Sequence, residues 1–160
     1  MVSLKVIFAS AVTVLFLAAC AAPAAQTGTS DISVKDAWAR PTIGGMSDMN
    51  MGNATPAAIA VYMTIDNKGS APDTLLSVAG DVAGSITLHE TKNDNGLMSM
   101  SELKDGLVIP ANSTVTLKPA STHLMAEGMK KELKVGDAFK LALRFKSGKE
   151  IPVDVAVREP

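Results

Sequence analysis

The chain has 160 residues, with 15 Lys or Arg residues against 16 Asp or Glu residues and a formal net charge of −1. This length favours one domain over two. The balanced charge argues against nucleic acid or anionic lipid as a partner, because either would need an excess of basic residues.

The first 19 residues predict a lipoprotein signal peptide. One positive charge, Lys5, precedes an apolar run from Val6 to Ala19, and the run ends in "LAAC" at residues 17–20. A membrane-spanning helix needs about 20 apolar residues, so this run is too short for one. A plain transmembrane anchor is the alternative, but no cluster of Lys or Arg follows the segment.

The ending "LAAC" resembles a bacterial lipobox, which predicts cleavage before Cys20 and acylation of its sulfur. Cys20 is the only cysteine. The folded domain would therefore contain no disulfide, no thiolate metal site and no nucleophilic thiol. Residues 20–30 are small and polar with Pro and Gly, which is typical of a flexible tether, and we expect the domain to occupy residues 31–160.

Beyond the tether, apolar residues alternate with polar ones at a period of two, which predicts β-strands. The clearest cases are residues 58–67, where Ile59, Val61, Met63 and Ile65 share one face, and residues 139–145 and 151–157 near the C-terminus. Shorter segments also predict strands. They lie at residues 33–40, 73–80, 84–91, 96–103, 113–120 and, if extended, 123–127.

No window of 11 residues shows a helical repeat. Eight or nine short strands separated by turn signals therefore predict an all-β domain, an antiparallel β-sandwich or Greek-key barrel. In the strand at 84–91, Ile86 and Leu88 take the core-facing phase, which leaves His89 on the opposite face. Since His123 comes at a predicted strand start, we expect a solvent-accessible site at an edge or end of the sandwich.

Four residues predict a site for a soft metal: His89, Met100, His123 and Met125. The chain has only two histidines. Met100 follows His89 by eleven residues, and Met125 follows His123 by two. Thioethers select Cu(I) among biological ions, and imidazole also suits copper, whereas zinc more often recruits Cys, His or carboxylates. Thioethers also avoid the oxidation to disulfides that threatens paired thiolates outside the cytoplasm.

Each of these residues has a structural alternative. A histidine on a strand is usually a surface residue, and methionine usually fills a core. Met63 lies in the apolar phase of its strand and is expected in the core. Met98 lies two residues from Met100 in the same phase, so it is either a core residue or a substitute ligand.

The pattern His-x10-Met-x22-His-x-Met, with "LHE", "NGLMSM", "IPANSTVTLKP" and "HLM" in that order, resembles the periplasmic copper chaperone family called PCuAC. The resemblance runs from "AWARPT" at residues 37–42 to the last strand. It implies a cupredoxin-like β-sandwich that binds Cu(I) and delivers it to the binuclear copper centre of cytochrome oxidase. It also implies that the ligands are His89, Met100, His123 and Met125.

One segment departs from this pattern. Residues 43–56, "IGGMSDMNMGNATP", contain Met46, Met49 and Met51 within six residues. Closely spaced thioethers in a Gly- and Asn-rich loop resemble the methionine clusters of other extracytoplasmic copper proteins. The segment would cap the main site or gather a second ion; the alternative is a loop with incidental methionines.

The sequence thus predicts an extracytoplasmic, lipid-anchored Cu(I) chaperone that passes its ion to an acceptor protein. Storage or detoxification of copper is an alternative, as is a metal-free interaction module on the same sandwich. An electron-transfer cupredoxin is disfavoured, because a blue-copper site needs a cysteine thiolate. No Ser-His-Asp set, phosphate loop or pair of catalytic carboxylates is evident, so an enzyme is not expected.

Overall fold

The computed structural model describes residues 28–42 and 58–159, and its regular structure there is all strand. Cys20, the predicted signal peptide at residues 1–19 and the three methionines of residues 43–56 lie outside the described residues. The ten strands are β1 (Ile32–Ala39), β2 (Ile59–Asn67), β3 (Asp73–Ala79), β4 (Ser85–Asp94), β5 (Leu97–Glu102), β6 (Leu107–Ile109), β7 (Ser113–Leu117), β8 (Thr122–Glu127), β9 (Ala138–Phe145) and β10 (Glu150–Val157). In these two ranges, no helix is long and apolar enough to cross a membrane.

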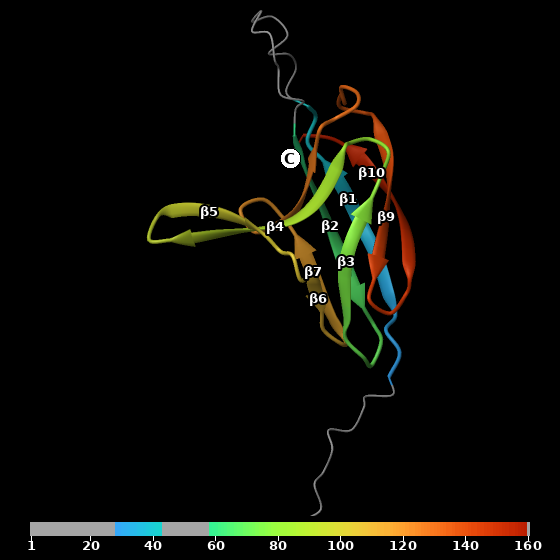
Figure 1. Ribbon diagram of the computed structural model, residues 1–160. Coiled ribbons are helices and arrows are strands. Elements are labelled where there is room, and N and C mark those ends of the chain that lie inside the picture. The colour runs from blue at the N-terminus through green and yellow to red at the C-terminus, as the bar shows by residue number, and fades with distance from the viewer. Residues whose placement is uncertain (1–27, 43–57, 160) are drawn as a thin grey trace, which may run out of the picture.

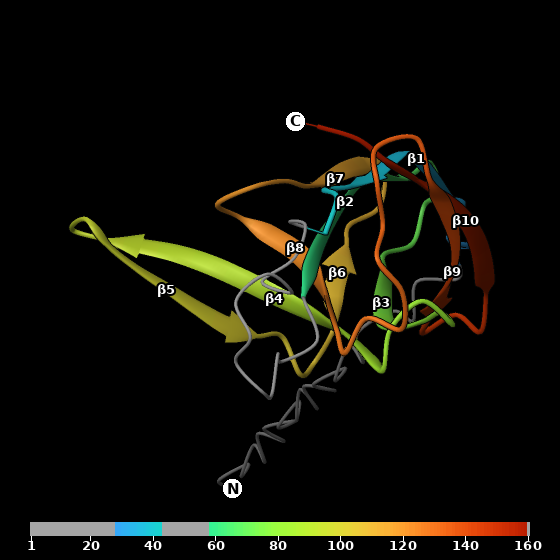
Figure 2. The same cartoon turned by 90° about the horizontal axis from the view of Figure 1, so that it is seen from above.

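The strands form one continuous sheet in the order β5-β4-β8-β2-β1-β10-β9-β3-β6, and β7 pairs with another stretch of β2. The sheet folds over on itself, so that β3, β9 and β10 lie on one side of the sandwich and β4 and β8 on the other (Figure 2). This confirms the predicted all-β sandwich. β6 escaped prediction because three residues are too few to show an alternation.

The sheet is mixed, whereas we expected an antiparallel one. Trp38 and Ala39 of β1 pair in parallel register with Ala156 and Val157 of β10, and the other strand pairs are antiparallel. The direction of β10 is set by its hairpin with β9. A period of two cannot reveal this, because side chains alternate in the same way in parallel and antiparallel strands.

Alternation assigns the faces of the strands as predicted. Ile59, Val61, Met63 and Ile65 of β2 are all buried, as are Phe139, Leu141, Leu143 and Phe145 of β9. Together with Leu88, Leu124 and the valines of β10 they form one core cluster. Met63 is therefore a core residue, as expected.

β4 and β5 form a hairpin that projects from the body of the sandwich (Figures 1 and 2). Asn95 and Gly96 connect the two strands with positive φ values of 52° and 89°. Positive φ at both central residues defines a type I′ turn, which Asn-Gly favours and which suits the twist of a two-stranded ribbon. All six residues of β5 are exposed.

The far end of β2 fastens the N-terminal segment to the body. The buried Asn67 accepts hydrogen bonds through its Oδ1 from the backbone N–H groups of Asp31 (3.1 Å) and Gly69 (3.0 Å). Gly69 permits this close approach, because a Cβ there would lie 2.2 Å from the carbonyl oxygen of Thr29. The entry of the chain into the fold is thus held by polar contacts as well as by the pairing of β1.

Asp73 is a second buried anchor at this end. Its carboxylate accepts hydrogen bonds from Ser30 Oγ (2.7 Å), the Thr74 N–H (2.8 Å) and the Ser147 N–H (3.1 Å). Burial by itself raises the pKa of Asp73, but the hydrogen bonds from Ser147, Ser30 and Thr74 outweigh it and hold the pKa below its usual value. The charged form of Asp73 therefore stabilises the fold.

We predict that Asp73 makes the protein acid-sensitive. Because the pKa is lower in the folded state than in the unfolded state, its contribution is complete above about pH 4, the ordinary range of an Asp pKa, and is lost as the pH falls through the lower folded-state pKa. Chemical denaturation at a series of pH values measures this. Asp73→Asn keeps an acceptor oxygen without the charge, so it should be less stable at neutral pH and show a shallower acid dependence. An unchanged acid dependence in the variant would contradict the assignment.

Candidate metal site

Strand register brings the two histidines directly opposite each other. β4 pairs with β8 on one side and with β5 on the other, so it is the central strand of this part of the sheet. His89 of β4 is the Cα partner of His123 of β8. Directly paired residues point to the same face, and Leu88 next to His89 points into the core. Both imidazoles therefore lie on the outer face.

Met125 shares this face and lies next to the histidine pair. It follows His123 by two residues on β8 and is the Cα partner of Thr87 of β4. Residues two apart on a strand are about 6.7 Å apart along it. Its side chain is half-buried, so it is held against the sheet but remains open to solvent.

Met100 shares the face but lies on the other side of the histidine pair. It is the Cα partner of Thr91, whereas Met125 pairs with Thr87. In a flat sheet the two methionines would lie about 13 Å apart along the strands and about 10 Å apart across them. Such a separation is too wide for both thioethers to reach one ion. The curl of the β4–β5 hairpin therefore decides whether Met100 joins the other three residues.

His123 is set up to bind through one particular nitrogen. Its side chain is buried, with 5% of the residue exposed, and its ring lies 6.1 Å from the ring of His89 between centroids. Nδ1 of His123 lies 2.9 Å from the carbonyl oxygen of Ser121. A carbonyl can only accept, so Nδ1 must carry the proton and Nε2 of the neutral ring keeps a free lone pair.

His89 contains a buried nitrogen that has no partner among the described residues. Its Nε2 lies 2.9 Å from Thr87 Oγ1, while Nδ1 is buried and has no hydrogen-bond partner in residues 28–42 and 58–159. An unsatisfied buried polar atom costs about 1–3 kcal/mol. A ligand at Nδ1 would remove that cost. The donor set thus fits a cation that accepts neutral nitrogen and sulfur ligands.

The alternative ligand, Met98, is not a core residue. It is 55% exposed on β5, close to the 52% of Met100, and it pairs with Asn93 nearer the hairpin tip. Its position leaves it farther from the histidines than Met100. Met98 is therefore either a substitute ligand or an exposed residue with no part in the site.

The sequence did not predict the row of aromatic rings that runs from His123 across the neighbouring strands β2 and β1. The ring of Tyr62 lies 6.4 Å from that of His123, and the ring of Trp38 lies 4.7 Å from that of Tyr62. The Arg158 guanidinium covers Trp38 at 4.9 Å. Burial raises the pKa of the Tyr62 phenol, so it stays neutral. The alternation in β2 predicted that Tyr62 lies on the face opposite the core. It could not predict that His123 of β8 and Trp38 of β1 would be its neighbours.

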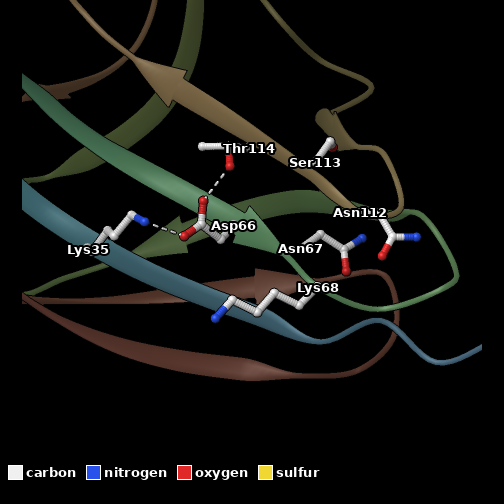
Figure 3. A pocket seen from close by; sticks show the side chains of 7 residues that line it. All are labelled: Lys35, Asp66, Asn67, Lys68, Asn112, Ser113 and Thr114. Atoms are coloured by element: carbon white, nitrogen blue, oxygen red, sulfur yellow. Dashed lines mark hydrogen bonds and ion pairs between the residues drawn. The ribbon is translucent and has the colours of Figure 1, made fainter.

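A polar depression lies farther along the outer face of β2, away from the histidines (Figure 3). Asp66 forms an ion pair with Lys35 and accepts a 2.6 Å hydrogen bond from Thr114 Oγ1. These contacts, that from Lys35 above all, lower the pKa of Asp66. The carboxylate is thus already neutralised by protein groups. In the described ranges no three or more His, Cys, Asp or Glu side chains are grouped to hold a metal ion.

Residues 32–157 match the family model described as "LpqE-like: Putative lipoprotein LpqE-like". A relative from Leifsonia xyli subsp. xyli, "Putative lipoprotein Lxx21020", is 34% identical over 128 residues, which are 80% of this chain and 70% of the relative.

Two solved structures share the fold. The solution structure of CuI-DR1885 from Deinococcus radiodurans is 30% identical, with a TM-score of 0.56 and 78% of each chain covered. The apo PCuAC domain from PmoF1 has a TM-score of 0.60, with 81% of this chain and 94% of that domain covered; at 23% identity it supports the fold alone. Because the family match spans nearly all of the described domain, the chain belongs to the LpqE-like family, also called the PCuAC family.

Proposed function

We propose that this protein is an extracytoplasmic chaperone that carries one Cu(I) ion as its cargo on His89, His123, Met125 and Met100. The observation that carries the proposal is the shared outer face of β4, β8 and β5, on which both histidines of the chain oppose each other with thioethers beside them. CuI-DR1885, a copper(I)-loaded relative, is similar over most of the domain. Imidazole and thioether donors are the ligands that suit Cu(I).

In this proposal the four ligands have different roles in holding and releasing the ion. His123 and His89 hold the ion through nitrogens that the fold orients in advance. Met125 adds a thioether from the same strand as His123. Met100 completes the site from the exposed β5, so it is the ligand that leaves first when the ion departs. All four donors are neutral, and ligand exchange therefore requires no separation of opposite charges.

The exposed fourth ligand favours delivery over storage, because 52% of Met100 remains open to an incoming donor. We propose that the acceptor is a copper protein outside the cytoplasm and, following the family resemblance, that it belongs to the assembly of the binuclear copper centre of cytochrome oxidase. Met46, Met49 and Met51 would serve as accessory ligands that supply or cap this site, a role that rests on the sequence alone.

We further propose that Cys20 carries the lipid and tethers the domain to a membrane. The chain enters the fold at Ser30 and Asp31, beside Asn67. Ala60, at the other end of β2, is the partner of Met125. The candidate site therefore lies at the opposite end of β2 from the entry of the tether, an arrangement that would turn the ligands away from the membrane.

The copper proposal predicts one Cu(I) per chain with a mixed shell of nitrogen and sulfur. X-ray absorption on the Cu(I)-loaded domain measures this shell directly. Loss of the pre-oriented nitrogen in His123→Ala should weaken Cu(I) binding by about a hundredfold, or roughly 2.7 kcal/mol, in competition with a chromophoric chelator. Met100→Leu should weaken it by only about tenfold, or roughly 1.4 kcal/mol, because Met100 lies on an exposed edge strand.

Met63→Leu is the matched control, since it removes a thioether from the core and should leave copper affinity unchanged. A first shell of oxygen and nitrogen alone, or equal affinities of His123→Ala and the wild type, would argue against the assignment.

The tether proposal predicts that Cys20→Ser abolishes lipid attachment. Without the sulfur, the precursor should accumulate unprocessed or the protein should appear in the soluble fraction. Membrane fractionation and mass spectrometry of the mature N-terminus measure both outcomes, and Thr27→Ala in the predicted tether serves as a control substitution beyond the lipobox. A Cys20→Ser protein that is processed and anchored like the wild type would disprove this reading.

A further inference from the structure

The outer edge of β5, next to the candidate site, pairs with no other described strand. In the described ranges, β5 pairs with β4 alone and stands at one end of the strand order. The hairpin projects from the sandwich in both views, so no described element covers this edge (Figures 1 and 2). Unpaired edges present backbone N–H and C=O groups that can pair with another strand.

The register determines which backbone groups point outward. A two-residue type I′ turn makes its flanking pair, Asp94 and Leu97, a hydrogen-bonded one, and bonded pairs then alternate along the hairpin. The bond from the Leu103 N–H to the Leu88 carbonyl oxygen, 2.8 Å, confirms this phase. Met98, Met100 and Glu102 fall between the bonded pairs, so their N–H and C=O groups point away from β4.

The same three residues send their side chains to the face of the candidate site. Met98 pairs with Asn93, Met100 with Thr91 and Glu102 with His89. A strand added at this edge would therefore hydrogen-bond to the backbone of a proposed ligand. Cross-strand side chains on one face have Cβ atoms about 4.5–5.5 Å apart, which brings a donor of the added strand within reach of the ion bound by Met100.

β5 lacks the usual protection against strand addition. Its sequence, "LMSMSE", contains no Lys and no Pro, and its first residue, Leu97, is 74% exposed. The hairpin has three carboxylates, Glu90, Asp94 and Glu102, against one cation, Lys92, which pairs with Glu90 at 3.0 Å. The edge therefore suits an extended segment that is neutral or basic and disfavours an acidic one.

We propose that the outer edge of β5 docks the copper acceptor by β-augmentation, with an extended, neutral-to-basic segment that carries thioether or imidazole donors. This inference rests on the proposed function. In the transfer step the bond from copper to Met100 Sδ breaks as a bond from copper to the acceptor's donor atom forms. Copper remains Cu(I), and no proton or electron moves.

The test compares Met98→Pro with Met98→Ala. Both variants lack the thioether, but only proline removes the outward N–H, and proline is tolerated on an edge strand whose N–H faces solvent. The probe is a synthetic ten-residue peptide of alternating threonine and methionine with a lysine at each end. We expect Cu(I) transfer to this peptide to be at least about tenfold slower from Met98→Pro, equivalent to roughly 1.4 kcal/mol in the barrier.

Three controls separate docking from other effects. Both variants should have the same Cu(I) affinity and should lose copper to a small chelator at the same rate. A peptide with the same side chains but alternate N-methylated amides should receive copper slowly from Met98→Ala as well. If circular dichroism shows that Met98→Pro does not fold, Glu102→Pro and Glu102→Ala provide the same comparison. Glu102 also has its N–H directed outward and is not a proposed ligand.

Equal transfer rates from the proline and alanine variants, with copper binding intact, would overturn the edge proposal and leave the proposed function standing. Wild-type protein that takes up no Cu(I) would overturn the proposed function itself. A dimer in sedimentation that Met98→Pro abolishes would assign the edge to a second copy of this chain and would likewise overturn the proposal.

Discussion

The pairing of β4 with β8 is the contact on which the candidate site depends. It opposes His89 to His123 and places both imidazoles on the outer face, while Leu88 and Leu124 of the same strands enter the core. A slip of one residue would exchange the faces, because side chains alternate at a period of two. Burial of the leucines therefore also fixes the position of the histidines. The same constraint therefore sets the core packing and the placement of the two candidate ligands.

The two sides of the histidine pair differ in exposure and in the contacts that hold them. On the β8 side, Ser121 orients His123, and Tyr62 and Trp38 extend a row of rings across β2 and β1. On the β5 side, the strand is exposed along its whole length and belongs to a projecting hairpin. The proposed cargo site would use both properties, since firmly held ligands would keep the ion and an accessible ligand would release it.

Polar contacts concentrate at the opposite end of the sandwich. Asn67 and Asp73 are buried there, and each satisfies several backbone groups of the turns around it. Such networks rigidify a structure only when every member has a partner. At the candidate site, by contrast, Nδ1 of His89 has no partner among the described residues. Within that part of the chain, the fold thus satisfies its polar groups where it is anchored and leaves one unsatisfied where a ligand would bind.

The sequence by itself determined which residues of the clearly alternating strands face the core, although it left Met98 of β5 open. Period-two alternation identified every described strand except β6, and the outward phase of His89, since it depends only on neighbours along the chain. The residues of the candidate site were also named from the sequence, through the chemistry of their side chains and the resemblance to a family. Their proposed role as ligands remains a prediction.

Tertiary structure alone decided how those residues lie relative to one another. The parallel pairing of β1 with β10, the opposition of His89 to His123 and the row from His123 to Trp38 all join strands that are far apart in the chain. Spacing along the chain carries no information about such pairing. It also could not reveal that Met100 and Met125 flank the histidines on opposite sides, because that separation follows from the register of β4 with two different partners.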